Sequence, residues 1–421
     1  MMNEHSLGEC RFPSPLKRKV SDHARMHARI VDDPSQPQRT DHLFEVAGPR
    51  EQIFFDPAVT RAGIVTCGGL CPGLNNVVRS IYLELTHHYG VKQVLGFRDG
   101  YGGLLPKPAK PPIVLDDDFV EDIHREGGTV LGTSRGPVDI ASAVTNLIDR
   151  AINILFVIGG DGTQRGGYEL FLEAKRRGHP LAVVGVPKTI DNDIPFVART
   201  FGYLTAVEAA DKVLKCAHTE VHSVHNGIAL VKLMGRHAGF IAASATIANQ
   251  DVNFTLVPEV PFKLDGENGF LACLKRRVLK RAHAVIVVAE GAGQDILGAD
   301  SNQKDASGNI KLIDIGPYLR ERIETYFKAE KIPFVFRYFD PSYLVRSVPA
   351  DSEDAILCDH FARNAVHAAM AGKTGMVIGL FHDHYIHVPV EWIVKEKRRL
   401  NPDGGTWHAV LAATGQPARF D

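Results

Sequence analysis

The chain has 421 residues, and 48 Lys+Arg against 49 Asp+Glu give it a formal net charge of −1 at pH 7. This balance excludes bulk nucleic-acid binding through a basic surface. Hydrophobic residues at 44% and charged residues at 23% exclude a chain that is disordered throughout.

The length predicts two or three domains, at about 150 residues each. The longest apolar runs, such as 152–159 and 284–289, are much shorter than the ~20 residues of a spanning helix, so we expect no membrane crossing. Six cysteines are too sparse for a disulfide scaffold, which favours a reducing, cytoplasmic compartment. The N-terminus lacks the apolar segment of a secretory signal.

Residues 1–57 are polar and rich in proline, and we expect an extension that is only partly attached to the body. From residue 61 the pattern changes to short apolar runs that end in Gly-rich or polar loops. These runs are Ala62–Thr66, Asn153–Gly159, Leu181–Val186, Ile228–Leu233, Ala284–Ala289 and Met376–Leu380. Such runs, separated by helix-length segments, are typical of buried parallel strands. They predict a doubly wound α/β fold with sites at the carboxyl ends of the strands.

The first loop, 66–75, precedes a helical pattern over 76–85. Its three glycines permit positive φ and close backbone approach, and the helix start offers free N–H groups to an anion. A tight strand-to-helix turn is an equal alternative, because the loop is neither a Walker sequence nor a spaced GxGxxG.

The second loop, 159–163, reads GGDGT. Its glycines permit the backbone to wrap a polyphosphate while Asp161 reaches Mg²⁺, a cation that prefers oxygen ligands. A turn-forming Asp-Gly needs only one glycine, so we favour phosphate binding.

The third loop, 187–193 (PKTIDND), places two carboxylates beside a lysine and a threonine. This set suits deprotonation of a hydroxyl nucleophile near a metal ion, although an Asx-rich turn explains Asp-Asn-Asp alone. The fourth loop, 234–239, presents Arg236 from a glycine turn, which suits bidentate phosphate binding.

Together the motifs TCGGLCPGLNN, GGDGT, PKTIDND and MGRHAGF, in this order, resemble the 6-phosphofructokinase family over roughly residues 60–375. PKTIDND and DPSYLVR are similar to its longer branch, which includes ATP-dependent enzymes of plants and protists and pyrophosphate-dependent bacterial ones. The resemblance implies two Rossmann-like doubly wound domains with mainly parallel sheets. We therefore expect a phosphoryl-donor domain at 58–203 and a sugar-phosphate domain at 204–421 whose C-terminal segments cross back. The implied reaction transfers a phosphoryl group to the 1-hydroxyl of fructose 6-phosphate.

The resemblance also implies site residues. Those matching the donor contacts are Gly69, Arg135, Gly136, Gly160, Asp161, Gly162 and Thr163, with Asp161 at the Mg²⁺ position. Those matching the substrate contacts are Thr189, Ile190, Asp191, Met234, Gly235, Arg236, Glu290, Tyr343 and Arg346. Asp191 is the expected proton acceptor, and Arg346 is a second clamp on the 6-phosphate.

Two departures from the short bacterial form limit what the resemblance implies. Gly227 stands where that form has an arginine that reaches into the neighbouring subunit, and DPSYLVR replaces its glutamine-arginine-glycine-glycine motif. The composite site and the allosteric rules of the short enzymes are therefore not carried over. We still expect a homo-oligomer, a dimer or a tetramer, with ATP and fructose 6-phosphate as ligands and no nucleic-acid or membrane partner.

The donor depends on Gly162. The family resemblance implies that pyrophosphate users carry an aspartate at the position of Gly162. The bulk and charge of an aspartate oppose the α-phosphate of ATP, so glycine at this position favours ATP as the donor. Lys188 decides little, because both kinds of enzyme carry it. Kinases of NAD and of lipids also have a GGDG loop, but the motifs TIDND and MGRHAG are not expected in them. A catalytically dead regulatory subunit is disfavoured because Asp161, Asp191 and Arg236 are all present.

Two further segments have chemistry-bearing residues. The histidines of 382–387 (HDHYIH) are of metal-ligand type, but we expect surface residues at the exit of a strand. The basic run 275–281 fits a solvated helix face, with an effector phosphate pocket as the alternative.

Overall fold

The computed structural model describes residues 5–28, 43–298 and 311–421. The chain divides into two compact units, which we describe one at a time. The first unit comprises Met1–Thr189, Ile194–Gly202 and Pro349–Lys397, and the second comprises Ile190–Asp193, Tyr203–Val348 and Arg398–Asp421. None of the helices in the described ranges combines the length and hydropathy that a bilayer crossing requires.

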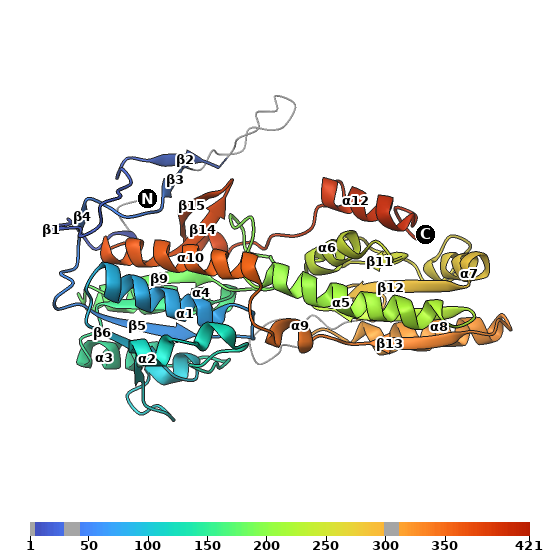
Figure 1. The fold of residues 1–421 in the computed structure, drawn as a ribbon, viewed down its shortest axis with the longest axis horizontal. Helices are drawn as coiled ribbons and strands as arrows, with labels where there is room; N and C mark the ends of the chain where they lie inside the picture. Colours follow the sequence, from blue (N-terminus) through green and yellow to red (C-terminus); the bar gives the residue numbers. More distant parts are fainter. Residues whose placement is uncertain (1–4, 29–42, 299–310) are drawn as a thin grey trace. The chain divides into compact units, whose positions relative to one another are not determined.

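A nine-stranded sheet forms the centre of the first unit, in the order β2-β3-β15-β14-β9-β8-β5-β6-β7 (Figure 1). These strands are β2 (Arg25–His27), β3 (Leu43–Val46), β5 (Arg61–Thr66), β6 (Gln93–Phe97), β7 (Ile113–Val114), β8 (Ile154–Gly159), β9 (Ala182–Pro187), β14 (Met376–Phe381) and β15 (His384–Pro389). The neighbours from β14 to β6 pair in parallel, and the strands at either side pair antiparallel. A separate pair joins β1 (Phe12–Pro13) to β4 (Gln52–Ile53).

Helices cover both faces of this sheet. The main ones are α1 (Leu74–Leu83), which continues as a π-helix over Glu84–His88, α3 (Ile140–Asp149), α4 (Asp161–Arg176) and α10 (Ser352–Met370). Leu155 and Val157 pack in one core with α3 and α4. Because successive side chains of a strand alternate, Phe156 points to the opposite face, where α1 packs against α10 (Figure 1). Shorter elements are α2 (Asp117–Val120), α11 (Val390–Ile393) and 3₁₀ turns at Gly100–Leu104 and Ile123–Arg125.

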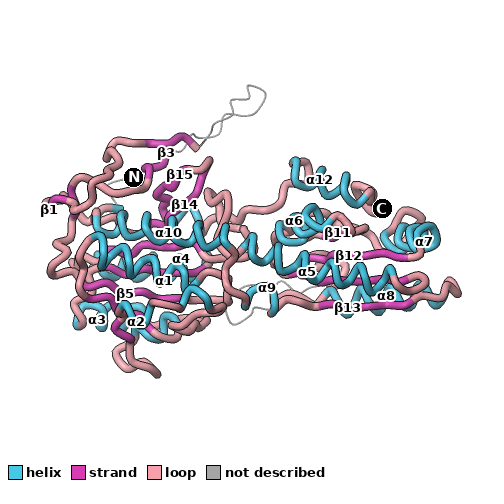
Figure 2. Tube along the Cα trace, viewed as in Figure 1, coloured by secondary structure: helices cyan, strands magenta, loops and turns pink. Residues whose placement is uncertain are grey.

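The second unit has a four-stranded parallel sheet in the order β11-β12-β10-β13. Its strands are β10 (Gly227–Leu233), β11 (Phe254–Leu256), β12 (His283–Ala289) and β13 (Val335–Phe339), and its helices are α5 (Tyr203–His222), α6 (Phe240–Asn249), α7 (Phe270–Arg281), α8 (Ile315–Ala329), α9 (Leu344–Ser347) and α12 (Gly405–Thr414). Figure 2 shows β12 and β13 as magenta segments that run alongside α5 and α8. The predicted α/β class with mainly parallel sheets is confirmed.

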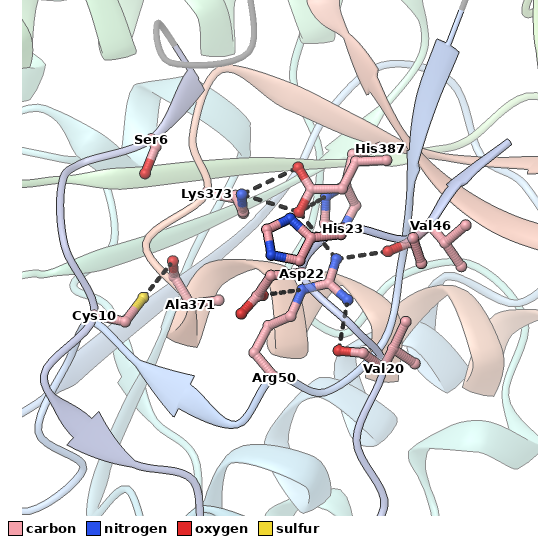
Figure 3. Close-up of polar contacts among 12 residues, drawn as sticks. Ser6, Cys10, Val20, Asp22, His23, Val46, Arg50, Ala371, Lys373 and His387 are labelled. Carbon is pink, nitrogen blue, oxygen red and sulfur yellow. Dashed lines mark hydrogen bonds and ion pairs between the residues drawn. The ribbon is translucent and has the colours of Figure 1, made fainter.

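Buried apolar side chains such as Phe44, which packs against Phe196, Phe381 and Trp392, and a cluster of ion pairs (Figure 3) both hold the described part of residues 1–57 on the first unit. The buried Arg50 donates from Nη2 to Glu45 Oε1 at 3.0 Å and to the carbonyl of Val46 at 2.6 Å. Lys373 lies on the other side of Glu45, with Nζ 2.9 Å from Oε1. Strand β3 also pairs with β15. This described part is therefore packed on the body, although its sequence has no sustained periodicity.

The interpretation of 382–387 as surface is wrong for His387. His382 and His384 are exposed, but His387 on β15 is only 7% exposed and lies 3.7 Å from Glu45 Oε1. The strand exit ends at residue 383, and the chain re-enters the sheet as β15, which β3 covers. Burial lowers the pKa of His387, so its ring is neutral at pH 7.

Candidate active site

The carboxyl ends of β5, β8 and β9 lie side by side, because these strands are adjacent and parallel in the first unit. Each strand is followed by one of the predicted loops, which start at residues 66, 159 and 187. The structure therefore brings the first loop, the GGDGT loop and the start of the PKTIDND loop to one edge of one sheet.

The GGDGT loop turns directly into α4, whose N-cap is Gly160. The first N–H groups of a helix have no acceptor within the helix, so this turn is suited to a phosphate. A Cβ on Gly159 would lie 2.4 Å from the Thr163 side chain, whereas a Cβ on Gly162 would meet nothing within 4 Å. Packing thus requires Gly159, and Gly162 leaves open space beside the helix start.

The first loop is tied to the segment that contains Arg135 and Gly136. Gly68 donates its N–H to the carbonyl of Ser134 at 3.2 Å, and its own carbonyl accepts from Thr133 Oγ1 at 2.7 Å. Arg135 and Gly136 are exposed. The backbone pairing therefore holds these two residues next to the loop that contains Gly69.

Lys188 places a buried positive charge at the same edge. Its side chain donates from Nζ to the carbonyl of Gly69, and its N–H donates to the carbonyl of Gly159 at 3.1 Å. The carbonyl of the following residue, Thr189, accepts from Thr200 Oγ1 at 2.6 Å. A cation fixed between two glycine loops favours a polyanionic ligand there.

Lys397 forms an ion pair with Asp161 that the sequence did not predict. Its Nζ lies 3.2 Å from Asp161 Oδ2, while Asp161 Oδ1 accepts from the Gly162 N–H at 2.8 Å. A cation thus already sits on the carboxylate that we assign to Mg²⁺. Nothing in the spacing of the motifs connects residue 161 with residue 397, and only a basic run at 395–399 marks this segment.

The segment 190–193 belongs to the second unit, where the C-terminal part of the chain fixes it. The N–H of Arg398 donates to the carbonyl of Asp193 at 2.9 Å, and its Nη1 lies 3.5 Å from the carbonyl of Asn192. Asn192 has a φ of 55°, which turns the chain between the two aspartates. Ile190 is buried and Asp191 is half-buried, so one side of the segment is anchored.

The arginine loop follows β10, and Glu290 follows β12, its parallel neighbour. Arg236 has a φ of 46°, and its N–H donates to Glu290 Oε1 at 3.0 Å. A Cβ on Gly291 would lie 1.6 Å from the carbonyl of Arg236, so only glycine permits this approach. Glu290 therefore positions the arginine loop, a contact that the sequence does not reveal.

Tyr343 and Arg346 follow β13, which lies on the other side of β10. The Arg346 guanidinium lies 4.9 Å from the centre of the Tyr343 ring. Its Nε is buried and has no hydrogen-bond partner within the described ranges. Nearby, Lys232 Nζ lies 2.9 Å from Asp314 Oδ2 and 2.8 Å from Asp340 Oδ2, which fixes the start of the segment after β13.

Close packing explains why glycine occupies position 227, the first residue of β10. A Cβ there would lie 2.2 Å from the carbonyl of Val221. No larger residue fits without a backbone shift, so this chain does not accommodate the arginine of the short bacterial form at this place.

Two groups of predicted residues result, one in each unit. The edge of the first unit brings together Gly69, Arg135, Gly136, Gly160, Asp161, Gly162, Thr163 and Thr189. The second unit carries Ile190 and Asp191 on one segment, and Met234, Gly235, Arg236, Glu290, Tyr343 and Arg346 after three neighbouring strands.

Two α/β units whose parallel strands end in glycine-rich and charged loops define a class of two-domain enzymes for phosphorylated ligands. The family model described as Phosphofructokinase matches residues 61–369. The chain belongs to the phosphofructokinase family.

Curated relatives match nearly the whole chain. The ATP-dependent 6-phosphofructokinase of Borreliella burgdorferi is 45% identical, covering 98% of this chain and 96% of the relative. The ATP-dependent 6-phosphofructokinase of Trypanosoma brucei brucei is also 45% identical, with 96% and 85% covered. The crystal structure of a pyrophosphate-dependent phosphofructokinase from Marinobacter aquaeolei has a TM-score of 0.70 at 22% identity, covering 85% of this chain and 91% of that chain. At this identity the likeness shows the fold alone.

Proposed function

We propose that the chain transfers the γ-phosphoryl group of ATP to the 1-hydroxyl of fructose 6-phosphate, giving fructose 1,6-bisphosphate and ADP. The observation that carries the proposal is the glycine-bounded start of α4, with open space at Gly162, in a chain about 45% identical to ATP-dependent 6-phosphofructokinases. Pyrophosphate is the alternative donor, and the open space at Gly162 favours ATP because it leaves room for the α-phosphate.

The first unit holds the donor in this proposal. The free N–H groups at the start of α4 and the ammonium of Lys188 bind the phosphates, and Asp161 binds Mg²⁺. One carboxylate fits this ion, because Mg²⁺ is commonly held by one or two carboxylates and the substrate's own phosphates. Bound Mg²⁺ would neutralise charge on the β- and γ-phosphoryl oxygens. Lys397 then has to leave Asp161 or share it, since its Nζ lies 3.2 Å from Oδ2.

The second unit holds the sugar phosphate. Asp191 accepts the proton of the 1-hydroxyl, because an alcohol is a weak nucleophile at neutral pH until a base takes its proton. Arg236 binds the 6-phosphate, and Arg346 is a second arginine that binds it. The buried Nε of Arg346 has no hydrogen-bond partner within the described ranges, which supports this role. Glu290 positions Arg236 through its backbone N–H at 3.0 Å.

We also propose a cytoplasmic homo-oligomer. Leu344 is a large hydrophobic side chain that is 67% exposed, which supports contact with another copy. Light scattering at several protein concentrations distinguishes a dimer or tetramer from a monomer, and a mass of one chain at all concentrations contradicts the proposal.

The test of function compares donors with fructose 6-phosphate in a coupled assay. We expect kcat/KM for ATP to exceed that for pyrophosphate, and excess chelator to abolish the rate with ATP. Added Mg²⁺ should restore it. A folded protein that uses neither donor, or keeps its full rate in chelator, contradicts the proposal.

A further inference from the structure

A buried lysine, Lys232, lies in the second unit at the point where the pairing of β10 with β13 ends. The last residues paired between the two strands are Val231 and Phe339. Lys232 and Asp340 follow them directly, one on each chain. The two side chains form an ion pair, with Lys232 Nζ 2.8 Å from Asp340 Oδ2. This ion pair therefore joins the two chains just beyond the last backbone pair.

A second carboxylate, that of Asp314 at the N-cap of α8, holds the same lysine. Lys232 Nζ lies 3.0 Å from Asp314 Oδ1 and 2.9 Å from Oδ2. Burial by itself lowers the pKa of Lys232, but the hydrogen bonds with Asp340 and Asp314 raise it above its usual range. The ammonium is therefore charged at neutral pH, and charge-assisted hydrogen bonds to two elements fix its position.

A short hydrogen-bonded turn leads from Asp340 to Arg346. The carbonyl of Pro341 accepts from the N–H of Leu344 at 2.8 Å and from that of Val345 at 3.1 Å. These bonds begin α9, the helix that carries Arg346. Val345 is fully buried, so the turn is anchored right beside the arginine. A displacement of Asp340 would therefore be passed on to the Arg346 guanidinium.

On the other chain, Lys232 lies two residues before the loop 234–239, which carries Arg236. That loop is held on its far side by Glu290, whose Oε1 accepts from the Arg236 N–H at 3.0 Å. Arg236 and Arg346 thus follow neighbouring strands, and the distance between them depends on how the ends of these strands are held. Two guanidiniums bind one phosphate only where both can reach it.

We propose that Lys232 is a positioning residue for the sugar phosphate. Through Asp340 it holds Arg346 where that guanidinium and the one of Arg236 bind the same phosphate. The inference rests on the proposed function, in which these two arginines bind the 6-phosphate. Without the ammonium, the carboxylates of Asp340 and Asp314 lose their common partner and repel each other, and the segment that carries Arg346 shifts.

The test compares three variants of the full chain in steady-state kinetics. Lys232→Met removes the charge at similar length. Asp340→Asn weakens the pair that leads to Arg346, whereas Asp314→Asn, the matched control, weakens the pair that leads to α8, where asparagine is still a good N-cap. We expect KM for fructose 6-phosphate to rise about tenfold in Lys232→Met and by a smaller factor in Asp340→Asn.

The other kinetic constants separate positioning from a general loss of structure. KM for ATP and kcat should stay nearly unchanged in both variants, because the lost interaction concerns only sugar binding. Asp314→Asn should resemble wild type in all constants. If Lys232→Met does not fold, Asp340→Asn decides the question, since it leaves Lys232 paired with Asp314. An unchanged KM for fructose 6-phosphate, or an equal rise in Asp340→Asn and Asp314→Asn, would overturn the proposal.

A double-mutant cycle tests whether Lys232 acts through Arg346. Arg346→Ala removes one of the two guanidiniums, so there is then nothing left for Lys232 to position. Lys232→Met should therefore raise KM for fructose 6-phosphate little further in an Arg346→Ala protein. The same fold-change in both backgrounds would overturn the proposal.

Hydrogen exchange of the ligand-free protein separates this inference from the proposed function. The amides of residues 342–347 should exchange faster in Lys232→Met and Asp340→Asn than in wild type and Asp314→Asn. Unchanged exchange would overturn the positioning role, whatever the protein phosphorylates. A wild type that is inactive with fructose 6-phosphate would instead contradict the proposed function, and with it the role of Lys232 in sugar binding.

Discussion

At the scale of single residues, we predict that Gly162 sets the choice of phosphoryl donor. A Cβ there meets nothing within 4 Å, so Gly162→Asp should fold and place a carboxylate beside the donor's phosphates. Repulsion of a like charge in a partly desolvated site costs several kcal/mol. We expect the ratio of kcat/KM for ATP over pyrophosphate to fall at least about 100-fold.

Gly162→Ala is the control for this variant. It adds a methyl group without charge to the same open space, so the ratio should change little. A Gly162→Asp protein that keeps the wild-type ratio, or a wild type that prefers pyrophosphate, would show that Gly162 does not determine the donor.

Asp191 is predicted to take the proton of the sugar hydroxyl. Asp191→Asn keeps the shape of the side chain and removes the base, so kcat should fall by about 10²–10⁴ while KM changes much less. Asp193→Asn is the matched control on the same turn and should lose less. Steady-state kinetics with ATP measure both, and a near-normal kcat for Asp191→Asn would assign the proton to another group.

Arg236 is predicted to bind the 6-phosphate through its planar fork. Arg236→Lys keeps the charge but loses the bidentate geometry, so the affinity for fructose 6-phosphate should fall about tenfold or more. Arg337→Lys is the control, since Arg337 is an exposed arginine of β13 in the same unit. Calorimetry with fructose 6-phosphate alone reads out binding, and unchanged affinity in Arg236→Lys would rule out this role.

At the scale of elements, most of the strands that lead to the site were predictable from the sequence. The six apolar runs became β5, β8, β9, β10, β12 and β14, because buried parallel strands carry unbroken runs of Val and Ile. β13 escaped notice: its sequence VFRYF is only partly buried and has a charged residue at its centre. β3 was missed because it has only four residues, of which one is the charged Glu45, so it forms no apolar run, although Phe44 is buried.

Long-range contacts in the site could not be predicted in the same way. The ion pair of Lys397 with Asp161 and the bond from Arg236 to Glu290 join segments far apart in the sequence. No periodicity encodes such pairs. Arg135 and Gly136 were named only through the family resemblance, because nothing in their local sequence indicates phosphate binding.

The ion-pair cluster on β3 makes a prediction about stability. Glu45→Gln removes the buried carboxylate between Arg50 and Lys373 and leaves Arg50 only the exposed carboxylate of Asp22, 3.3 Å from its Nε. Breaking a buried pair typically costs about 3–5 kcal/mol. Glu51→Gln is the control, since Glu51 pairs with Lys19 at the surface and should change stability by less than about 1 kcal/mol. Urea midpoints of the two variants measure this, and equal midpoints would show that the cluster contributes nothing.

The same cluster predicts the direction of the pH dependence. Burial by itself raises the pKa of Glu45, but His387 and Lys373 hold it well below its usual range. Its contribution is therefore complete above about pH 4.5 and is lost as the pH falls below that value. Burial lowers the pKa of His387 and, to about 3, that of His367, so both favour unfolding below about pH 6.5. The urea midpoint should fall from pH 7 to pH 4, and a rise over this range would contradict these assignments.

At the scale of the whole molecule, the proposed function assigns different roles to the residues of the two units. In the proposal the first unit contributes glycine loops, a helix start and the carboxylate for Mg²⁺, all suited to a nucleotide's phosphates. The second contributes the proposed base and arginines, suited to a phosphorylated alcohol. Neither set alone suffices for phosphoryl transfer, which requires a bound donor and an oriented, deprotonated acceptor.

The most direct measurement follows the phosphoryl group itself. The full chain is incubated with fructose 6-phosphate, Mg²⁺ and ATP labelled in the γ-phosphoryl group, and the products are separated and identified. We expect the label in the phosphate on carbon 1 of fructose 1,6-bisphosphate, with one ADP formed for each labelled sugar. Label released only as inorganic phosphate, or found at another position of the sugar, would contradict the function proposed for this chain.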